Sequence, residues 1–335
     1  MEQSRFTEAR GEATVPQERL EQALFEIRRV IAGQDAMLER VLVCLLAQGH
    51  LLIEGVPGLA KTLTIKTTAA VLGGSFARVQ FTPDLVPADL VGTRVYRPDT
   101  GSFDTELGPV FCNFLLADEI NRAPAKVQSA LLEVMQERQV TIGGETHKVP
   151  DPFVVMATQN PIETEGTYAL PEAPVDRFMM KVLVGYPSEE EEFVIVQRVT
   201  GIADDVMSVC TTDELRELQK ECRKVYVEPS LIQYAVRLSN ATRAPDKYLT
   251  YGASPRASIH MIEGARALAF LRGRDYALPE DVTDLVPDVL RHRLVLSYEA
   301  LAEGLTSDQL IGNLLKKVRA PARVLGSHGR IAAAA

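Results

Sequence analysis

The segment HLLIEGVPGLAKT, residues 50–62, joins a short apolar run to a loop of Gly and Pro residues that ends in Lys61 and Thr62. This arrangement is typical of a phosphate-binding loop between a buried strand and a helix, where backbone N–H groups surround phosphate. Lys61 can reach the β and γ oxygens, and the Thr62 hydroxyl can bind Mg²⁺. Ala60 stands where the G-x-x-x-x-G-K-[ST] pattern has Gly. A plain Gly/Pro turn with an exposed lysine is therefore the alternative that the rest of the chain must exclude.

Composition limits the classes of protein to consider. The 335 residues are 46% hydrophobic and 24% charged, which is ordinary for a globular protein long enough for two domains. The net charge of −9 argues against a general nucleic-acid partner, which usually needs a basic footprint. No apolar run approaches the roughly 20 residues of a membrane span, so we expect no membrane insertion. The four scattered cysteines form no C-x-x-C pair and, without a secretory signal, favour a cytoplasmic location.

Strand and helix patterns alternate up to about residue 187, and helical patterns follow alone. Alternation predicts an α/β core with a mainly parallel sheet wrapped by helices, followed by an all-α region. Strands are expected at 51–54, 76–81, 110–117, 153–157 and 180–184. The main helices are expected at 16–30, 35–47, 59–71, 123–138, 229–241, 254–271, 279–296 and 307–318.

These patterns predict a division of the chain. Residues 82–108 are rich in Pro, Asp and Gly and read as an insertion on the core, and residues 139–150 contain a hairpin signal at Gly143-Gly144. The expected parts are a polar tail and helix at 1–30, the α/β core at 31–187, the all-α region at 188–325 and a disordered tail at 326–335.

Two adjacent carboxylates, Asp118 and Glu119, follow the apolar run that ends at Ala117. Ligands in open α/β sheets bind at the carboxyl ends of the strands, which is where this pair is expected. Asp118 can hold the water shell of Mg²⁺, and Glu119 can orient and deprotonate a water that attacks the γ-phosphate. The alternative is a turn whose carboxylates cap the next helix. Because the two carboxylates occur in the same chain as the phosphate-loop pattern, with a strand and a helix between them, that alternative is weaker.

Further polar residues lie at predicted strand ends and helix starts. Asn160, after the run Val154 to Gln159, can hydrogen-bond the attacking water or the γ-phosphate, although Asn-Pro turns are common. Arg177 and Arg256 are candidates to stabilise charge on that phosphate, with Arg122 a weaker third. A single arginine is more often a surface ion-pair partner. For Arg291, Arg293, Lys316, Lys317 and Arg319 we expect a solvated face, or one that meets another subunit.

Together these segments resemble the AAA+ ATPases, and among them the MoxR family. The resemblance runs from about residue 16 to about residue 318, and Ala before the loop lysine is usual in MoxR-like loops. The matching segments are Gly33-Gln34, GVPGLAKT at 55–62, FTPDL at 81–85, GPVF at 108–111, LLADEINRAP at 115–124, ATQNP at 157–161, LPEA at 170–173, DRF at 176–178 and SPR at 254–256. Pro174-Val175 departs from the Gln-Leu that relatives often have.

The resemblance implies a role for each matching position. Asp118 and Glu119 match Walker B, Asn160 matches sensor 1 and Arg256 matches sensor 2. Arg177 matches the arginine finger offered to a neighbouring subunit. ATP and Mg²⁺ are the implied ligands, with Thr62 and Asp118 at the metal. The implied nucleotide-binding residues are Gly33 and Gln34 beside the adenine, Gly55, Val56, Pro57, Gly58, Leu59, Ala60, Lys61 and Thr62 in Walker A, and Asp118.

The family also implies a hexameric ring with a chaperone-like action on partner proteins, often ones with von Willebrand factor A domains. Residues 82–108 then correspond to the helix-2 insert and residues 139–150 to the pre-sensor-1 hairpin. One alternative is an ATP-gated scaffold with little hydrolysis, although it would have no need of Glu119 or Asn160. A second is an AAA+ motor on nucleic acid, which the acidic charge disfavours. A small-molecule kinase is weaker still, because the all-α region would have no role.

Overall fold

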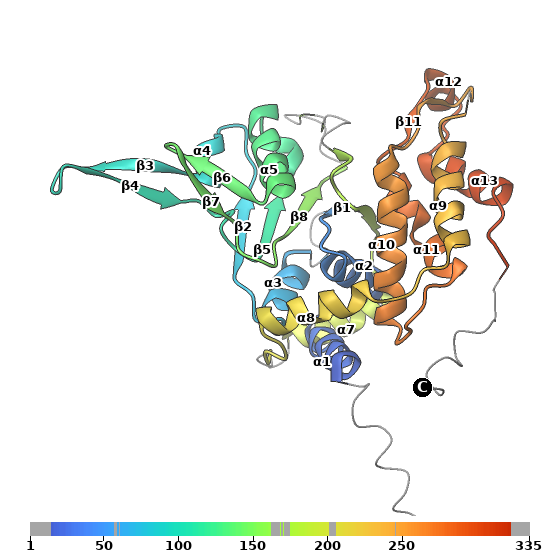
Figure 1. The fold of residues 1–335 in the computed structure, drawn as a ribbon, viewed down its shortest axis with the longest axis horizontal. Coiled ribbons are helices and arrows are strands. Elements are labelled where there is room, and N and C mark those ends of the chain that lie inside the picture. The colour runs from blue at the N-terminus through green and yellow to red at the C-terminus, as the bar shows by residue number, and fades with distance from the viewer. Residues whose placement is uncertain are drawn as a thin grey trace, which may run out of the picture.

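The computed structural model describes residues 15–56, 59, 61–161, 168, 170, 175–200, 206–244 and 246–322. A parallel five-stranded sheet, in the order β2-β5-β8-β1-β9, forms the centre of the N-terminal half (Figure 1). The C-terminal part of the chain is mainly helical, so the predicted α/β class with a helical region after it is confirmed. The sheet strands are β1 (Leu51–Gly55), β2 (Phe76–Gln80), β5 (Phe114–Asp118), β8 (Val154–Gln159) and β9 (Met180–Val184).

Alternate residues of the central strands point to two separate apolar cores. In β5, Phe114 and Leu116 belong to one core, and Leu115 and Ala117 belong to the other. All four side chains are buried, as expected for a strand that has helices on both faces. Burial of each Val, Leu or Phe side chain contributes about 1.5–3 kcal/mol. The continuous apolar run that predicted this strand therefore follows from its position in the middle of the sheet.

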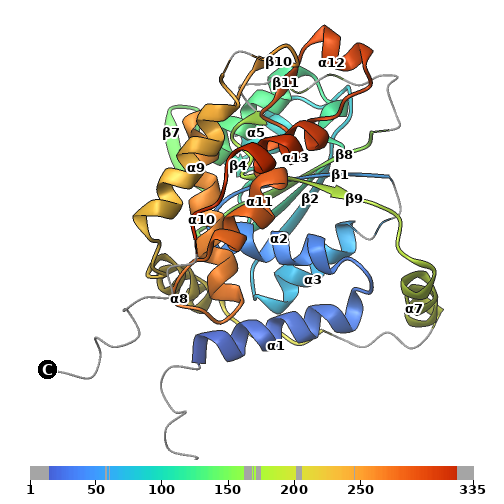
Figure 2. The ribbon, with the colours of Figure 1, turned by 90° about the vertical axis from the view of Figure 1, so that its right-hand side faces the viewer.

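Helices cover both faces of the sheet. The first core includes α1, α2 and α3, and Figure 2 shows α2 and α3 against the sheet with α1 beyond them. The second core includes α4 and α5. The helices of the N-terminal half are α1 (Val15–Val30), α2 (Asp35–Leu46), α3 (Lys61–Val71), α4 (Pro87–Val91), the 3-10 turn η1 (Ile120–Arg122) and α5 (Ala125–Glu137).

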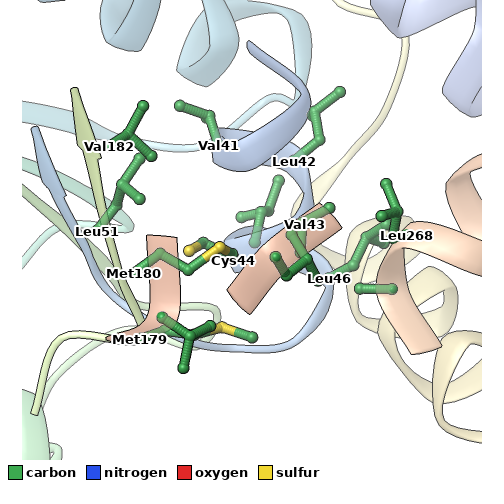
Figure 3. Close-up of a cluster of buried hydrophobic side chains, with 14 of the residues drawn as sticks. Val41, Leu42, Val43, Cys44, Leu46, Leu51, Met179, Met180, Val182 and Leu268 are labelled. Atoms are coloured by element: carbon green, nitrogen blue, oxygen red, sulfur yellow. The ribbon is translucent and has the colours of Figure 1, made fainter. Parts of the chain in front are cut away.

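The first core continues without a break into the C-terminal helices. Figure 3 shows Leu46 of α2 and Met179, beside β9, in the same cluster as Leu268 of α10. The C-terminal helices are α7 (Glu189–Thr200), α8 (Thr212–Arg223), α9 (Pro229–Ala241), α10 (Pro255–Leu271), α11 (Pro279–Leu290), α12 (Tyr298–Ala302) and α13 (Ser307–Lys317). Two short strands, β10 (Leu249–Tyr251) and β11 (Val295–Leu296), pair among them. Within the described residues, no helix is long and apolar enough to cross a bilayer.

Two antiparallel hairpins extend from the sheet half. β3 (Gly92–Arg97) pairs with β4 (Ser102–Leu107) and projects away from the body of the molecule in Figure 1. β6 (Gln139–Ile142) pairs with β7 (Glu145–Lys148) across the Gly143-Gly144 turn, so the predicted hairpin is confirmed. β4 had no counterpart in the sequence prediction, since its residues are largely exposed and lack an apolar run.

Two predicted boundaries were wrong. The strand expected from residue 110 begins only at Phe114, because Val110 is buried in a turn in which its N–H donates to the Leu90 carbonyl, 3.2 Å away. The helix expected at 279–296 ends at Leu290, and residues 295–296 turn into β11. Both segments are apolar, so periodicity alone did not separate a buried turn or short strand from its neighbour.

Candidate active site

A cavity of about 440 Å³ lies at the carboxyl end of the sheet, between the start of α3 and the ends of β2, β5 and β8. It brings together Lys61, Thr62, Asp118, Glu119 and Asn160, which the sequence placed on three separate segments. The complete set of lining residues is Leu59, Lys61, Thr62, Leu63, Arg78, Gln80, Asp118, Glu119, Thr158 and Asn160.

Lys61, the first residue of α3, is the lysine among the described residues that line this cavity. Gly55 ends β1 so close to β9 that a Cβ atom there would lie 2.7 Å from the Val184 carbonyl oxygen. The Lys61 ammonium donates to the Gly55 carbonyl at 2.6 Å, and Thr62 follows in the first turn of α3. Pro57, Gly58 and Ala60 lie outside the described residues. Gly55, Val56 and Leu59 are described, and only Leu59 of these lines the cavity.

The electrostatics of Lys61 suit an anionic ligand. Burial lowers the pKa of the Lys61 ammonium, while the carboxylates of Asp118, Glu119 and Glu54 oppose that shift. Desolvation is the larger effect, so the charged lysine is incompletely compensated by the protein. A phosphate beside the ammonium would supply the missing negative charge.

The backbone conformation of Glu119 and hydrogen bonds with Thr158 of the neighbouring strand β8 fix the positions of Asp118 and Glu119. Glu119 adopts the left-handed conformation, with φ of 55° and ψ of 51°, which is uncommon for a residue other than glycine. The buried Thr158 hydroxyl accepts a hydrogen bond from the Glu119 N–H at 2.9 Å and donates to Asp118 Oδ1 at 2.5 Å. Strained backbone held by such contacts is a recurring feature of functional sites.

Three further polar side chains contact these carboxylates, two of them unforeseen from the sequence. Arg78 Nη2 lies 2.6 Å from Asp118 Oδ2, and Gln80 Nε2 lies 2.7 Å from Glu119 Oε2. Arg122, the weaker arginine candidate, pairs with Glu119 at 3.0 Å. Arg78 and Gln80 are two residues apart in β2 and therefore point to the same face of the sheet. They reach the carboxylates because β2 pairs with β5, and periodicity does not reveal that pairing.

Asn160 lies directly after β8 and is buried at the cavity wall. Since β8 pairs with β5 in parallel, the residues that follow the two strands emerge at the same edge of the sheet. The side-chain amide offers two donors and one acceptor oxygen, enough to orient a water or a phosphate oxygen.

Four other predicted site residues lie outside this cavity lining. Gly33 has φ of 57° beside Glu191 of α7, and Gln34 directly precedes α2. Arg177 is half-buried in the turn before β9. Arg256 is the second residue of α10, and its Nη1 lies 3.3 Å from Asp176 Oδ2.

The expectation of a solvated face was wrong for Arg293 and Arg291. The Arg293 side chain is only 1% exposed and pairs with Asp176 at 2.8 Å. Arg291 is 10% exposed, pairs with Asp288 and Asp308 and donates to the Lys181 carbonyl. Asp288 and the Val289 carbonyl are local acceptors in α11, but the others come from α13 and from the segment around β9. The local charge pattern could therefore not reveal the burial.

The donor chemistry of the cavity fits a magnesium–nucleotide complex. A threonine hydroxyl, Thr62, and one carboxylate, Asp118, are oxygen ligands of the kind that Mg²⁺ takes from proteins when phosphates and waters complete its shell. Among the described residues there is no cluster of three or more His, Cys, Asp or Glu side chains suited to a metal. A resident all-protein metal cage is therefore not formed by this part of the chain.

Comparison with known proteins agrees with this geometry. Residues 50–180 match the family "ATPase family associated with various cellular activities (AAA)", and residues 240–314 match the family "AAA lid domain". The chain is 56% identical to Chaperone MoxR1 of Mycobacterium tuberculosis over 310 residues, covering 90% of this chain and 82% of that protein. It is 30% identical to Protein MoxR of Methylorubrum extorquens, covering 88% and 93%.

A solved structure shows that the likeness extends to the fold. A candidate ATPase from Cytophaga hutchinsonii is 46% identical and superposes with a TM-score of 0.87 over 92% of this chain and 97% of that one. Sequence identity, both family matches and the shared fold agree over most of the chain. The protein therefore belongs to the MoxR family of AAA+ ATPases.

Proposed function

We propose that this protein hydrolyses ATP in the presence of Mg²⁺ and uses the energy to remodel or activate partner proteins. The observation that carries the proposal is the cavity that gathers Lys61, Thr62, Asp118, Glu119 and Asn160 at one edge of the sheet. A cation, a hydroxyl, two carboxylates and an amide are the groups that phosphoryl transfer to water requires.

Each group has a distinct role in this proposal. Lys61 binds the β- and γ-phosphate oxygens, and Glu119 accepts the proton of the attacking water. Asn160 orients that water or the γ-phosphate. Thr62 and Asp118 would hold Mg²⁺, which, when bound, neutralises charge on the phosphates.

Oligomerisation completes the proposed site. Arg177 of one subunit would enter the cavity of the next and stabilise charge that develops on the γ-phosphate, so hydrolysis requires assembly. Arg256 would contact nucleotide within its own subunit after a movement of the helical region, because in this structure it pairs with Asp176. Gly33 and Gln34 would lie beside the adenine. The proposed assembly is a hexameric ring, and analytical ultracentrifugation with and without ATP would measure its mass.

The proposed division of the chain follows the same logic. Residues 31–187 form the nucleotide-binding core and residues 188–325 the lid, with the insert at 82–108 and the hairpin at 139–150 passing motion to a client. The β3–β4 hairpin supports a contact role for the insert, because it projects from the body of the molecule (Figure 1). Its Tyr96 and Phe103 side chains are exposed. We propose a cytoplasmic setting, which the four free cysteines fit.

The decisive experiment replaces the proposed base. Glu119→Gln keeps the size of the side chain but removes its basicity, so ATP should still bind while phosphate release falls by about 10²–10⁴-fold. Glu133→Gln, on the exposed face of α5, is the matched control and should release phosphate like the unaltered protein. Undiminished turnover by Glu119→Gln would contradict the assignment. Negligible phosphate release by the unaltered protein in the assembled state would instead favour an ATP-gated scaffold.

The class of partner can be tested with the same variant. An ATP-bound, non-hydrolysing ring should hold its client longer, so Glu119→Gln is the protein to use for co-purification. We expect the retained partner to contain a von Willebrand factor A domain. Retention of nucleic acid that weakens steeply with salt would point to a motor on DNA or RNA.

A further inference from the structure

Arg293, three residues beyond α11, lies where the helical region meets the sheet, and its side chain is 1% exposed. We call its contact with residues 176–179, in the turn before β9, the joint. Its guanidinium donates to the carbonyls of Asp176 at 3.0 Å, Phe178 at 2.6 Å and Met179 at 3.2 Å. It also donates to the carbonyl of Val289 in the last turn of α11. Burial of an unpaired arginine costs several kcal/mol. The three acceptors on residues 176–179 therefore indicate a specific contact that compensates the buried charge.

The Asp176 carboxylate joins that contact to a second helix. Asp176 Oδ1 accepts from Arg293 Nε at 2.8 Å. Asp176 Oδ2 accepts from the Ser254 hydroxyl at 2.8 Å and from Arg256 Nη1 at 3.3 Å. Ser254 is the N-cap of α10, so one carboxylate ties the turn before β9 to both α10 and the end of α11.

Arg177 lies inside the tethered segment. The backbone is held at residue 176 before it and at residues 178 and 179 after it, all by the Arg293 guanidinium. The His292 Nε2–H adds a hydrogen bond to the Phe178 carbonyl at 3.1 Å. Because three backbone carbonyls around Arg177 are fixed by residues that follow α11, the course of the main chain at Arg177 depends on the position of α11.

We propose that Arg293 is a positioning residue for Arg177. Through Asp176 and the three carbonyls, it holds the turn in the conformation that presents Arg177 to the neighbouring subunit, and it makes that presentation follow movements of the helical region. This inference rests on the proposed function, in which Arg177 acts in the cavity of the next subunit. A planar guanidinium can serve this set of acceptors, whereas a lysine ammonium, with a single nitrogen, cannot reach them all.

Mixed assemblies test the inference. Glu119→Gln subunits have a silent cavity but an intact Arg177, and serve as donors. Arg177→Ala subunits keep an intact cavity and serve as acceptors. Mixing the two should restore ATP hydrolysis, measured as phosphate release. Arg293→Lys is then placed either in the donor or in the acceptor.

We expect asymmetry between the two placements. Arg293→Lys in the donor should reduce the restored rate about tenfold or more, because small displacements of a catalytic group have effects of this size. In the acceptor the same change should leave the restored rate within about twofold of the parent mixture, since the acceptor's residue 177 is already alanine. Arg291→Lys in the donor is the matched control and should preserve rescue. It too joins α11 to the sheet, but at the Lys181 carbonyl, away from Arg177.

Two results would overturn the inference. One is rescue by Arg293→Lys donors equal to that by unaltered donors. The other is an equal reduction of the rate in both placements, which indicates a general structural role. ATP binding, melting temperature and assembly mass are measured for each variant. Should Arg293→Lys fail to assemble, Asp176→Asn is placed in the donor, and assembly loss by both would likewise overturn the inference. Failure of the parent mixture to hydrolyse ATP would instead refute the proposed trans arrangement.

Discussion

Two arginine–aspartate ion pairs have similar N···O distances but differ in how far the arginine is buried. At the cavity, Arg78 and Asp118 approach to 2.6 Å, yet the Arg78 side chain is 48% exposed. At the joint, Arg293 and Asp176 approach to 2.8 Å, and the Arg293 side chain is 1% exposed. The first pair lines the cavity, and the guanidinium of the second is packed among backbone carbonyls.

The difference in burial determines what each pair can do. The two aspartates are similarly exposed, at 14% and 15%, so the contrast lies in the arginines. Water competes for the half-exposed Arg78 guanidinium, so we expect Arg78 to release Asp118 at little cost when ligand arrives. A buried pair is expensive to separate, because either partner left alone is a desolvated charge. We therefore expect the cavity to exchange its contacts when ligand binds, and the joint to stay together as one unit. Four predictions test this contrast, from the largest expected effect to the smallest.

Arg293→Ala should give the largest loss of stability. It removes the buried guanidinium from Asp176, whose side chain is 15% exposed and keeps its contacts with Ser254 and Arg256. Breaking a buried pair in this way typically costs about 3–5 kcal/mol. The shift in urea midpoint, multiplied by the slope of the transition, measures the loss. A loss below about 1 kcal/mol would show that the joint is not the rigid element described here.

Lys61→Ala should act on nucleotide affinity instead. Removing a partly buried ammonium that contacts phosphate costs about 2–5 kcal/mol of binding free energy, or roughly 30-fold to several thousand-fold in Kd. Calorimetric titration with a non-hydrolysable ATP analogue gives the value. Lys66→Ala, at an exposed position of the same helix, should leave Kd unchanged. Equal losses in the two variants would remove Lys61 from the site.

Acid should weaken the joint through its histidines. Burial, assisted by the charge of Arg293, lowers the pKa of His260 to about 3 and that of His292 well below its usual range. Both are neutral in the fold but take up protons in the unfolded chain below about pH 6.5. Stability is therefore fully present above pH 6.5 and falls with decreasing pH, by about 1.4 kcal/mol per pH unit for each histidine.

Urea unfolding at pH 7.5, 6.5 and 5.5 measures this dependence. His50 lies outside the joint, and burial lowers its pKa to about 3. It therefore adds a third loss of stability as the pH falls. His260→Gln should make the decline shallower by the contribution of one histidine. An unchanged slope in that variant would mean that His260 is not held neutral by the joint.

Arg78→Ala should have the smallest effect on stability, below about 1 kcal/mol, because the Arg78 end of its ion pair with Asp118 is 48% exposed to water. Asp118, 14% exposed, keeps its hydrogen bond from Thr158. The same urea experiment that is used for Arg293→Ala applies. A loss comparable to that of Arg293→Ala would erase the contrast between the two regions. A small loss, together with unaltered ATP binding, would support a pair that exchanges readily.

The extent to which the sequence foretold the structure varied with the range of the interactions. β1, α3 and the phosphate-loop pattern between them were predicted from local signals, as were β8, α9 and the β6–β7 turn. The position of Asp118 and Glu119 beside Lys61 was also foreseen, because strand ends in a parallel sheet share an edge. Arg78, Gln80 and Thr158 were not assigned contacts with the carboxylates, since those depend on which strands are neighbours.

By itself, the sequence determined that an α/β core with a phosphate-loop pattern and two strand-end carboxylates precedes a helical region, because periodicity and adjacent residue types are local properties. The order β2-β5-β8-β1-β9 was decided only by the tertiary structure, and with it the contacts of Arg78 and Gln80. Arg293, in a charged stretch that favoured a solvated face, is buried because its acceptor Asp176 lies 117 residues away. Pairings over such separations depend on packing of the whole chain, which no local pattern encodes.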